Sequence, residues 1–188
     1  MSEITNGVSV KSMSVTDIVN TYYKDFWKYN NKGKNAFLPE EQLIDVVKKI
    51  IYSSYELNIR ERVESKLTSL TGQVVKIHPH GDESISESIK GCASKQKSQP
   101  ATRLLEGIGN FGDLSGDLGA QARYLFIAGT PIMSAIYKDI PFMDIVEDEE
   151  GNKYPNYIST PLPFTLINGT ALIGTGKSSY LDEKGLSV

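Results

Sequence analysis

The two histidines of the chain lie two residues apart, at His78 and His80, with Pro79 between them. We expect a helix to begin just after them, and helix N-termini attract phosphate groups. The imidazoles can therefore act as phosphate or proton-transfer partners, which is the interpretation that we favour. Two alternatives stay open: a metal site with Asp82 as a third ligand, or a structural turn whose backbone is fixed by Pro79.

A glycine-rich segment follows and ends at the sequence Ala122-Arg123-Tyr124. Its glycines concentrate in residues 106–112 and at Gly116, a spacing that suits neither a regular helix nor a strand. Glycine loses more backbone freedom on folding than any other residue, so a purely structural stretch rarely carries such a run. We therefore predict that residues 76–124 form a site that handles a phosphodiester, with Tyr124 as its reactive group.

Residues 171–178 match a relaxed Walker A pattern, with Ala171 where the first glycine is normally found. A nucleotide-binding P-loop also needs a following helix and an acidic residue on a later strand that holds Mg²⁺. Ten residues follow Ser178, so we do not expect a complete nucleotide fold. Nucleotide binding is kept as a competing hypothesis.

The composition restricts the classes of partner. With 188 residues, 39% hydrophobic and 23% charged, the chain can bury one sizeable core. A net charge of −3 argues against coating of nucleic acid by bulk charge, so any DNA contact must be local. No apolar run approaches the roughly 18–20 residues that span a bilayer, and the single cysteine suits a reducing compartment. We expect a cytoplasmic protein with no membrane partner.

Hydrophobic periodicity predicts helices on both sides of the histidine pair. Before the pair, the expected elements are helices at residues 18–27, 39–54 and 57–70, the last ended by Thr71-Gly72, and a β-like run at 74–77. After the pair, Asp82 is expected to cap a helix with the apolar stripe Ile85, Ile89 and Cys92, and Ser86 on its polar face. This order, followed by a polar loop at 94–102, is typical of a helix-turn-helix or winged-helix domain.

Beyond Tyr124, the apolar residues up to Met133 predict a helix that continues as far as Pro131. We expect strands at 136–137 and 142–146, around an acidic turn at 147–153. Asn168-Gly169 predicts a tight turn.

Three sequence blocks resemble the DNA breakage–reunion region of type IIA DNA topoisomerases, the gyrase A and topoisomerase IV A-type proteins. The first is the histidine turn at 78–82, and the second is the glycine-rich segment 107–117 with the Ala122-Arg123-Tyr124 end. The third is Pro161-Leu162-Pro163, followed by residues 166–169 and 173–176. The blocks occur in the family's order and spacing, and the relaxed Walker A match is part of the third.

The resemblance implies that Tyr124 attacks a DNA phosphodiester and forms a transient 5′-phosphotyrosyl bond. A phenol with a pKa of about 10 is a poor nucleophile at neutral pH and needs help from its neighbours. Arg123 would stabilise the developing charge, and His80, with His78, would hold the phosphate or move a proton. Further DNA contacts are expected from a wedging isoleucine and from lysines: Ile173, Lys34, Lys48, Lys49, Lys76 and Lys90. We expect the pair Lys48-Lys49 on the solvent-exposed face of its helix.

The implied fold is α+β, a helical winged-helix (helix-turn-helix) DNA-binding domain followed by the β-rich start of a tower domain. We expect an N-terminal arm and helix at residues 1–33. The winged-helix cleavage domain with the catalytic tyrosine would occupy 34–126, and the incomplete start of the tower 127–188.

The resemblance also implies partners. The expected activity is ATP-dependent strand passage on double-stranded DNA, which changes DNA topology. We expect Mg²⁺ to be held by a Toprim domain and ATP by an ATPase domain of a gyrase B-like partner, with neither bound by this chain alone. A homodimer of the cleavage domain is expected in the full enzyme. The alternative function is a winged-helix DNA-binding module that does not cut DNA.

The chain departs from the family pattern at several positions. Ile44-Asp45 stands where Lys-Pro is expected, Lys48-Lys49 replaces an arginine pair, and Ile108 replaces a usual glutamine. Glu83 occupies the position of the serine or threonine that anchors quinolone drugs, so we expect no normal drug binding. This divergence indicates a viral or otherwise distant relative, acting in a bacterial cytoplasm or in the host cell of a virus.

Overall fold

A computed structural model describes residues 43–94, 103–113, 115–164 and 167, with short segments outside these ranges. The helices are α2 (Asp45–Glu56), α3 (Leu67–Ile77), α4 (Asp82–Ala93) and α5 (Pro131–Tyr137), with the 3-10 turns η3 (Ala122–Tyr124) and η4 (Ile140–Phe142). The strands between them are β3 (Ser65–Lys66), β4 (Leu105–Ile108), β5 (Phe126–Gly129), β6 (Ile145–Glu147) and β7 (Lys153–Pro155). Two further antiparallel pairs join β1 (Glu3–Thr5) to β2 (Val8–Val10) and β8 (Thr170–Gly174) to β9 (Lys177–Leu181).

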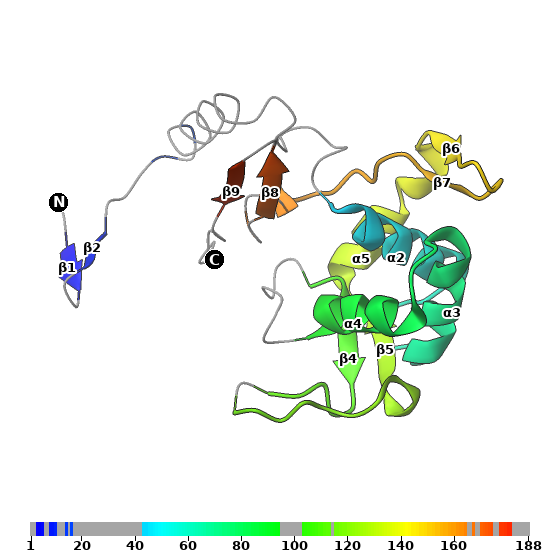
Figure 1. Cartoon of the computed structure of the whole chain (residues 1–188), viewed down its shortest axis with the longest axis horizontal. Coiled ribbons are helices and arrows are strands. Elements are labelled where there is room, and N and C mark those ends of the chain that lie inside the picture. The colour runs from blue at the N-terminus through cyan, green and yellow to red at the C-terminus, as the bar shows by residue number, and fades with distance from the viewer. Residues whose placement is uncertain are drawn as a thin grey trace.

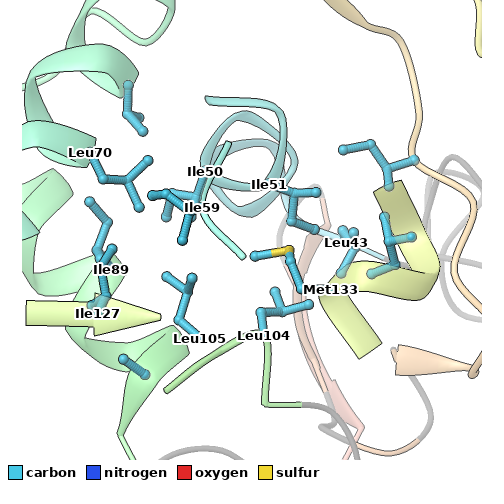
Figure 2. Packing of buried hydrophobic residues seen from close by; sticks show 14 of the residues in the cluster. Leu43, Ile50, Ile51, Ile59, Leu70, Ile89, Leu104, Leu105, Ile127 and Met133 are labelled. Carbon is cyan, nitrogen blue, oxygen red and sulfur yellow. The ribbon is translucent and has the colours of Figure 1, made fainter. Parts of the chain in front are cut away.

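The three helices α2, α3 and α4 pack against one another and against a small sheet (Figure 1). Their apolar faces meet at Ile50, Leu70 and Ile89, each fully buried. Leu105 and Ile127 close the same core from the sheet (Figure 2). Burying each of these side chains stabilises the fold by about 1.5–3 kcal/mol, so this cluster holds the helices and the sheet together.

The sheet has the order β3-β5-β4, with both neighbours antiparallel to β5. At its end, Gly129 N–H donates to the carbonyl oxygen of Arg60 at 3.0 Å. A Cβ atom at Gly129 would lie 3.1 Å from the Arg60 carbonyl carbon. Glycine here therefore lets the segment after α2 cross close to the sheet.

Helix α3 contradicts two expectations for the segment before the histidines. Thr71-Gly72 does not end a helix, and residues 74–77 are not β-like, because α3 runs from Leu67 through both to Ile77. The Thr71 hydroxyl lies 3.1 Å from both the Leu67 carbonyl oxygen and the Ser86 hydroxyl, so its polar group is satisfied inside the helix pair. Ser86 is thus buried, and its expected place on the polar face of α4 is wrong.

Residues 57–64 do not form the expected helix either. Asn58 and Arg62 have positive φ angles of 55° and 60°, which interrupt a right-handed helix. The segment is instead a loop that ends in the short strand β3.

The region after Tyr124 also differs from the expectation. Residues 126–129 form strand β5, and the following helix begins at Pro131 and includes Ile136-Tyr137. Proline has no N–H to lose at a first helical position, and the Thr130 hydroxyl accepts from the Met133 N–H. The strand expected at 142–146 begins only at Ile145, because Phe142 ends η4. The acidic turn is confirmed, because β6 and β7 pair as a hairpin around it.

The described residues confirm a mixture of helices and small antiparallel sheets, in agreement with an α+β class. No helix in this part of the chain has the length and apolar character to cross a membrane. The helix expected at 39–54 begins later, at Asp45, because Leu43 lies in a bend and the N-cap Ile44 is extended. The expected helix at 18–27, Pro39 and Lys34 lie outside the described residues, as does most of the polar loop at 94–102.

We predict that Gly72→Ala raises the free energy of unfolding by about 0.5–1 kcal/mol, because alanine restricts the unfolded chain and suits a helix interior. Gly72 is exposed within α3, and nothing lies within 4 Å of an added Cβ. Urea denaturation measures the change. The contrasting variant Gly129→Ala should destabilise the protein, and a destabilising Gly72→Ala would mean that the helix ends there.

Candidate functional site

The histidine pair lies where α3 ends. His78 is the C-terminal cap of α3, and the imidazole rings of His78 and His80 stack with centroids 4.2 Å apart and planes 5° apart. The His80 N–H donates to the His78 carbonyl oxygen across Pro79 at 2.7 Å. Among the described residues, no group of three or more His, Cys, Asp or Glu side chains is arranged to hold a metal ion. Asp82 therefore does not complete a ligand set with the two imidazoles.

The first turn of α2 faces His78. Asp45 Oδ2 lies 3.5 Å from His78 Nδ1 and 3.1 Å from Lys49 Nζ. Burial, followed by the nearby His80 and Lys49, lowers the pKa of His78, whereas Asp45 acts in the opposite direction. The ion-pair distance alone would suggest a raised pKa, but Asp45 is half exposed and already paired, so solvent screens its pull. This lowered pKa favours the neutral form of His78 at pH 7.

The pair Lys48-Lys49 is not on a solvent-exposed face, contrary to the expectation. Lys49 is 7% exposed, and its Nζ lies 4.4 Å from the centre of the Tyr154 ring. Lys48 Nζ donates to the carbonyl oxygen of Asn156 at 3.0 Å. The two lysines therefore fasten α2 to β7 and the residue after it.

The other lysines expected to contact DNA also have internal partners where the structure describes their side chains. Lys76 Nζ donates to Gln73 Oε1 at 2.9 Å, and Lys90 Nζ pairs with Glu87 Oε1 at 2.7 Å. Ile173 lies in β8, where only the backbone is described.

Helix α4 begins differently from the expectation. Its N-cap is Gly81, and Asp82 is its first helical residue, whose Oδ1 accepts from the Glu83 N–H at 3.0 Å. Ile85 and Ile89 are buried as predicted. Cys92 packs against the same core, and burial raises the pKa of its thiol to about 12, so it stays protonated at neutral pH.

Tyr124 is 62% exposed at the end of η3. The Arg123 guanidinium lies 5.0 Å from the centre of the Tyr124 ring. The next residue, Leu125, is fully buried, and its carbonyl oxygen accepts from the Leu67 N–H at 3.1 Å. This anchor holds the phenol and the guanidinium side by side in solvent.

The glycine-rich segment is a loop held together by hydrogen bonds of Asn110 and Asp117. The Asn110 side-chain amide donates to Asp117 Oδ2 at 2.8 Å, while Asp117 Oδ1 accepts from the Gly119 N–H at 2.8 Å. Gly112 and Gly119 have positive φ angles. A Cβ atom on Gly112 would lie 2.5 Å from the Asp117 carbonyl oxygen, and one on Gly119 would lie 2.6 Å from the Gly112 nitrogen. Only glycine fits both positions, which explains the sequence pattern. The sequence alone did not predict that Asn110 holds this loop together. The feature that could have indicated it is an Asn and an Asp that each stand next to a glycine.

The structure does not bring all the candidate residues together within one chain. The start of α3 is bonded to Leu125, next to Tyr124, whereas His78 caps the opposite end of α3. The 11 residues of α3 span about 16 Å. Arg123 and Tyr124 therefore lie at one end of α3, and the histidine pair, with Asp45 and Lys49, lies at the other.

Comparison with known proteins gives a consistent result. The family of the DNA gyrase/topoisomerase IV A subunits matches residues 43–183. The DNA gyrase A protein of Borreliella burgdorferi is 32% identical over 148 residues, which cover 75% of this chain and 18% of that protein. The Spiroplasma citri protein of the same name is 30% identical over 149 residues, which cover 76% of this chain and 64% of that protein. The DNA gyrase A protein of Thermotoga maritima is 29% identical over 150 residues, which cover 76% of this chain and 18% of that protein. The matched region is thus less than two thirds of each relative's length.

We predict that Asp117→Ala loosens the loop without changing the melting temperature. The hydrogen bonds from Asn110 and then Gly119 lower the pKa of Asp117 from 3.8, so its carboxylate is charged at neutral pH and holds the loop. Faster amide exchange at Gly119 and Ala120 is expected by NMR. Asp144→Ala, an exposed acid in another region, serves as the matched control. Unchanged amide exchange at Gly119 would show that the hydrogen bonds of Asp117 do not hold the loop.

Proposed function

Because the chain belongs to the family of DNA gyrase/topoisomerase IV A subunits, we propose that Tyr124 is the nucleophile of a type IIA breakage–reunion reaction. The observation that carries the proposal is an exposed phenol next to a guanidinium, anchored by a buried neighbour: Tyr124, Arg123 and Leu125. An accessible nucleophile beside a permanent cation is what attack on a phosphodiester requires.

The proposed step is a transesterification. The Tyr124 phenolic oxygen attacks the phosphorus, the bond to the 3′ oxygen breaks, and the 5′ end of the cut strand becomes linked to the tyrosine. Arg123 stabilises the negative charge on the oxygens around phosphorus, because its charge is close and always present. The freed 3′-OH later reverses the step after a second duplex has passed, in an ATP-dependent reaction that changes DNA topology.

The proposed DNA-binding unit is a winged helix built from α2, α3, α4 and the sheet β3-β5-β4, with the region from residue 127 onwards as the start of a tower. The packing of three helices on a small antiparallel sheet supports this arrangement. The lysines proposed to contact DNA would have to leave their internal partners to do so: Lys48, Lys49, Lys76 and Lys90. Lys34 and Ile173 remain part of the proposal from the resemblance alone.

The histidines support the proposal in a less direct way. His80 is exposed, and with His78 it is proposed to hold the scissile or a neighbouring phosphate, or to transfer a proton. One helix length separates the pair from Tyr124 in the same chain. We therefore propose that the active site forms across a homodimer, with the histidine pair of one copy beside the tyrosine of the other.

The remaining components are proposed to come from partners. From the family resemblance, we propose that Mg²⁺ is held by the Toprim domain of a gyrase B-like protein. ATP is proposed to bind the ATPase domain of the same partner. The substrate is double-stranded DNA, and the proposed location is the cytoplasm.

We expect Tyr124→Phe to abolish the covalent protein–DNA product while DNA affinity stays unchanged, because only the attacking oxygen is lost. Arg123→Gln should reduce cleavage by about 10²-fold or more, the loss expected for one charge-stabilising group. The assay traps covalent complexes on plasmid DNA with a gyrase B-type protein present. Tyr157→Phe, a partly exposed tyrosine elsewhere, is the control. A Tyr124→Phe chain that still traps DNA would refute the proposal, and DNA binding without trapping by wild type would favour the non-cutting module.

A second experiment tests the shared active site by mixing Tyr124→Phe and His80→Ala chains. In a mixed dimer with sites formed across the two copies, one site contains both an intact tyrosine and an intact histidine. Cleavage of one strand should then recover relative to either homodimer, as measured by nicked plasmid. Mixed dimers no more active than the His80→Ala homodimer would place both residues in one chain's site.

A further inference from the structure

Asp45 is the first helical residue of α2, at a position where the resemblance led us to expect proline. An acid in the first turn of a helix is favourable on general grounds, because of the helix dipole. That preference does not explain why its carboxylate is directed at an imidazole. Asp45 Oδ2 lies 3.5 Å from Nδ1 of His78, a residue 33 positions later at the end of another helix.

The carboxylate is held in place by the lysines of its own helix. Asp45 Oδ2 lies 3.1 Å from Lys49 Nζ, and Oδ1 lies 3.7 Å from Lys48 Nζ. Lys49 is itself buried over the Tyr154 ring, so it cannot swing into solvent without breaking this contact. Both carboxylate oxygens of the half-exposed Asp45 therefore have a lysine of the same helix within ion-pair distance.

His78 in turn forms the surface on which the second histidine rests. Its ring is mostly buried, with a side-chain exposure of 14%, and it stacks nearly parallel to the exposed ring of His80. The chain between the two rings is short and contains Pro79. Whatever fixes the plane of His78 thus also fixes the plane of His80.

We propose that Asp45 is a positioning residue, which keeps a proton on Nδ1 of His78 and so holds that ring as the platform for His80. This inference rests on the proposed function, in which His80 meets a DNA phosphate. A neutral imidazole carries one N–H, and a carboxylate facing Nδ1 places it there, which leaves Nε2 as an acceptor. Asp45 thereby sets both the tautomer and the orientation of the histidine pair.

The charges around His78 agree with this role. Asp45 and Lys49 face it from α2, and His80 faces it from the turn. Tyr154 of β7 lies behind Lys49, and Lys76 of α3 is turned toward Gln73. Burial, His80 and Lys49 lower the pKa of His78, and Asp45 is the group that opposes them. Removing the carboxylate should therefore lower this pKa further.

NMR titration of the full chain tests the coupling, because the protein has two histidines and His80→Gln assigns their signals. In Asp45→Asn, the pKa of His78 should fall by about half a unit, as expected for loss of one partly screened charge partner. The ¹⁵N shifts should show mixed tautomers, and the ring-current shifts between the two imidazoles should shrink. Asp45→Glu should restore all three signals.

The matched control is Asp139→Asn, which changes the net charge equally at an exposed site before η4. It should leave both histidines unchanged. Circular dichroism checks folding, and the half-exposed Asp45 is not expected to be needed for it. A folded Asp45→Asn chain with unchanged His78 pKa, tautomer and ring-current shifts would overturn the inference.

Covalent trapping with a gyrase B-type protein links the coupling to the reaction. Asp45→Asn should reduce trapping several-fold and displace the acid limb of its pH profile, whereas Asp45→Glu should recover it. Trapping by Asp45→Asn at the wild-type level and pH profile would refute a positioning role in the reaction. Absence of trapping by the wild type would instead refute the proposed function, while the NMR result still decides whether Asp45 controls His78.

Discussion

The junction between the start of α3 and strand β5 is the constraint on which the exposed tyrosine depends. Ser65 and Lys66 pair with β5, and the next residue, Leu67, donates its N–H to the carbonyl oxygen of Leu125. Both leucines are fully buried. Withdrawing Leu125 from the core would forfeit most of the roughly 2–5 kcal/mol that a core leucine contributes. Tyr124 consequently cannot fold inward, and its direction is set by the residue that follows it.

The loop before Tyr124 is ordered although it is exposed to solvent. Its carboxylates are fully exposed and its glycines are costly to fix, so hydrogen bonds within the loop must hold its shape. Asp113 Oδ1 accepts from the Ser115 N–H and hydroxyl, and Asp117 binds Asn110 and Gly119. The Ala120 N–H returns to the Asn110 carbonyl oxygen at 2.8 Å and closes the loop. The chain thus reaches η3 along a defined path.

Local sequence patterns predicted some of this and missed what depends on tertiary contacts. The stripe of Ile85 and Ile89 and the acidic hairpin follow from periodicity and turn residues. The continuation of α3 through Thr71-Gly72 does not, because a buried hydroxyl pair across two helices satisfies Thr71. The glycine-rich segment indicated Tyr124, and the family resemblance added Arg123 beside it. Neither indicated Asp45, because its contact with His78 joins two helices that are far apart in the sequence.

The internal pairing of the lysines has a consequence for how ionic strength acts on DNA binding. Proteins that neutralise phosphates with free cations release condensed counterions, which makes their affinity fall steeply as salt rises. Here Lys48, Lys49 and Lys90 already bind a carbonyl or carboxylate oxygen. If these lysines contact DNA as proposed, each must exchange that partner for a phosphate, and the exchange returns an acceptor to solvent. The affinity for DNA should then depend only weakly on salt and rest more on the shape of the duplex than on its charge.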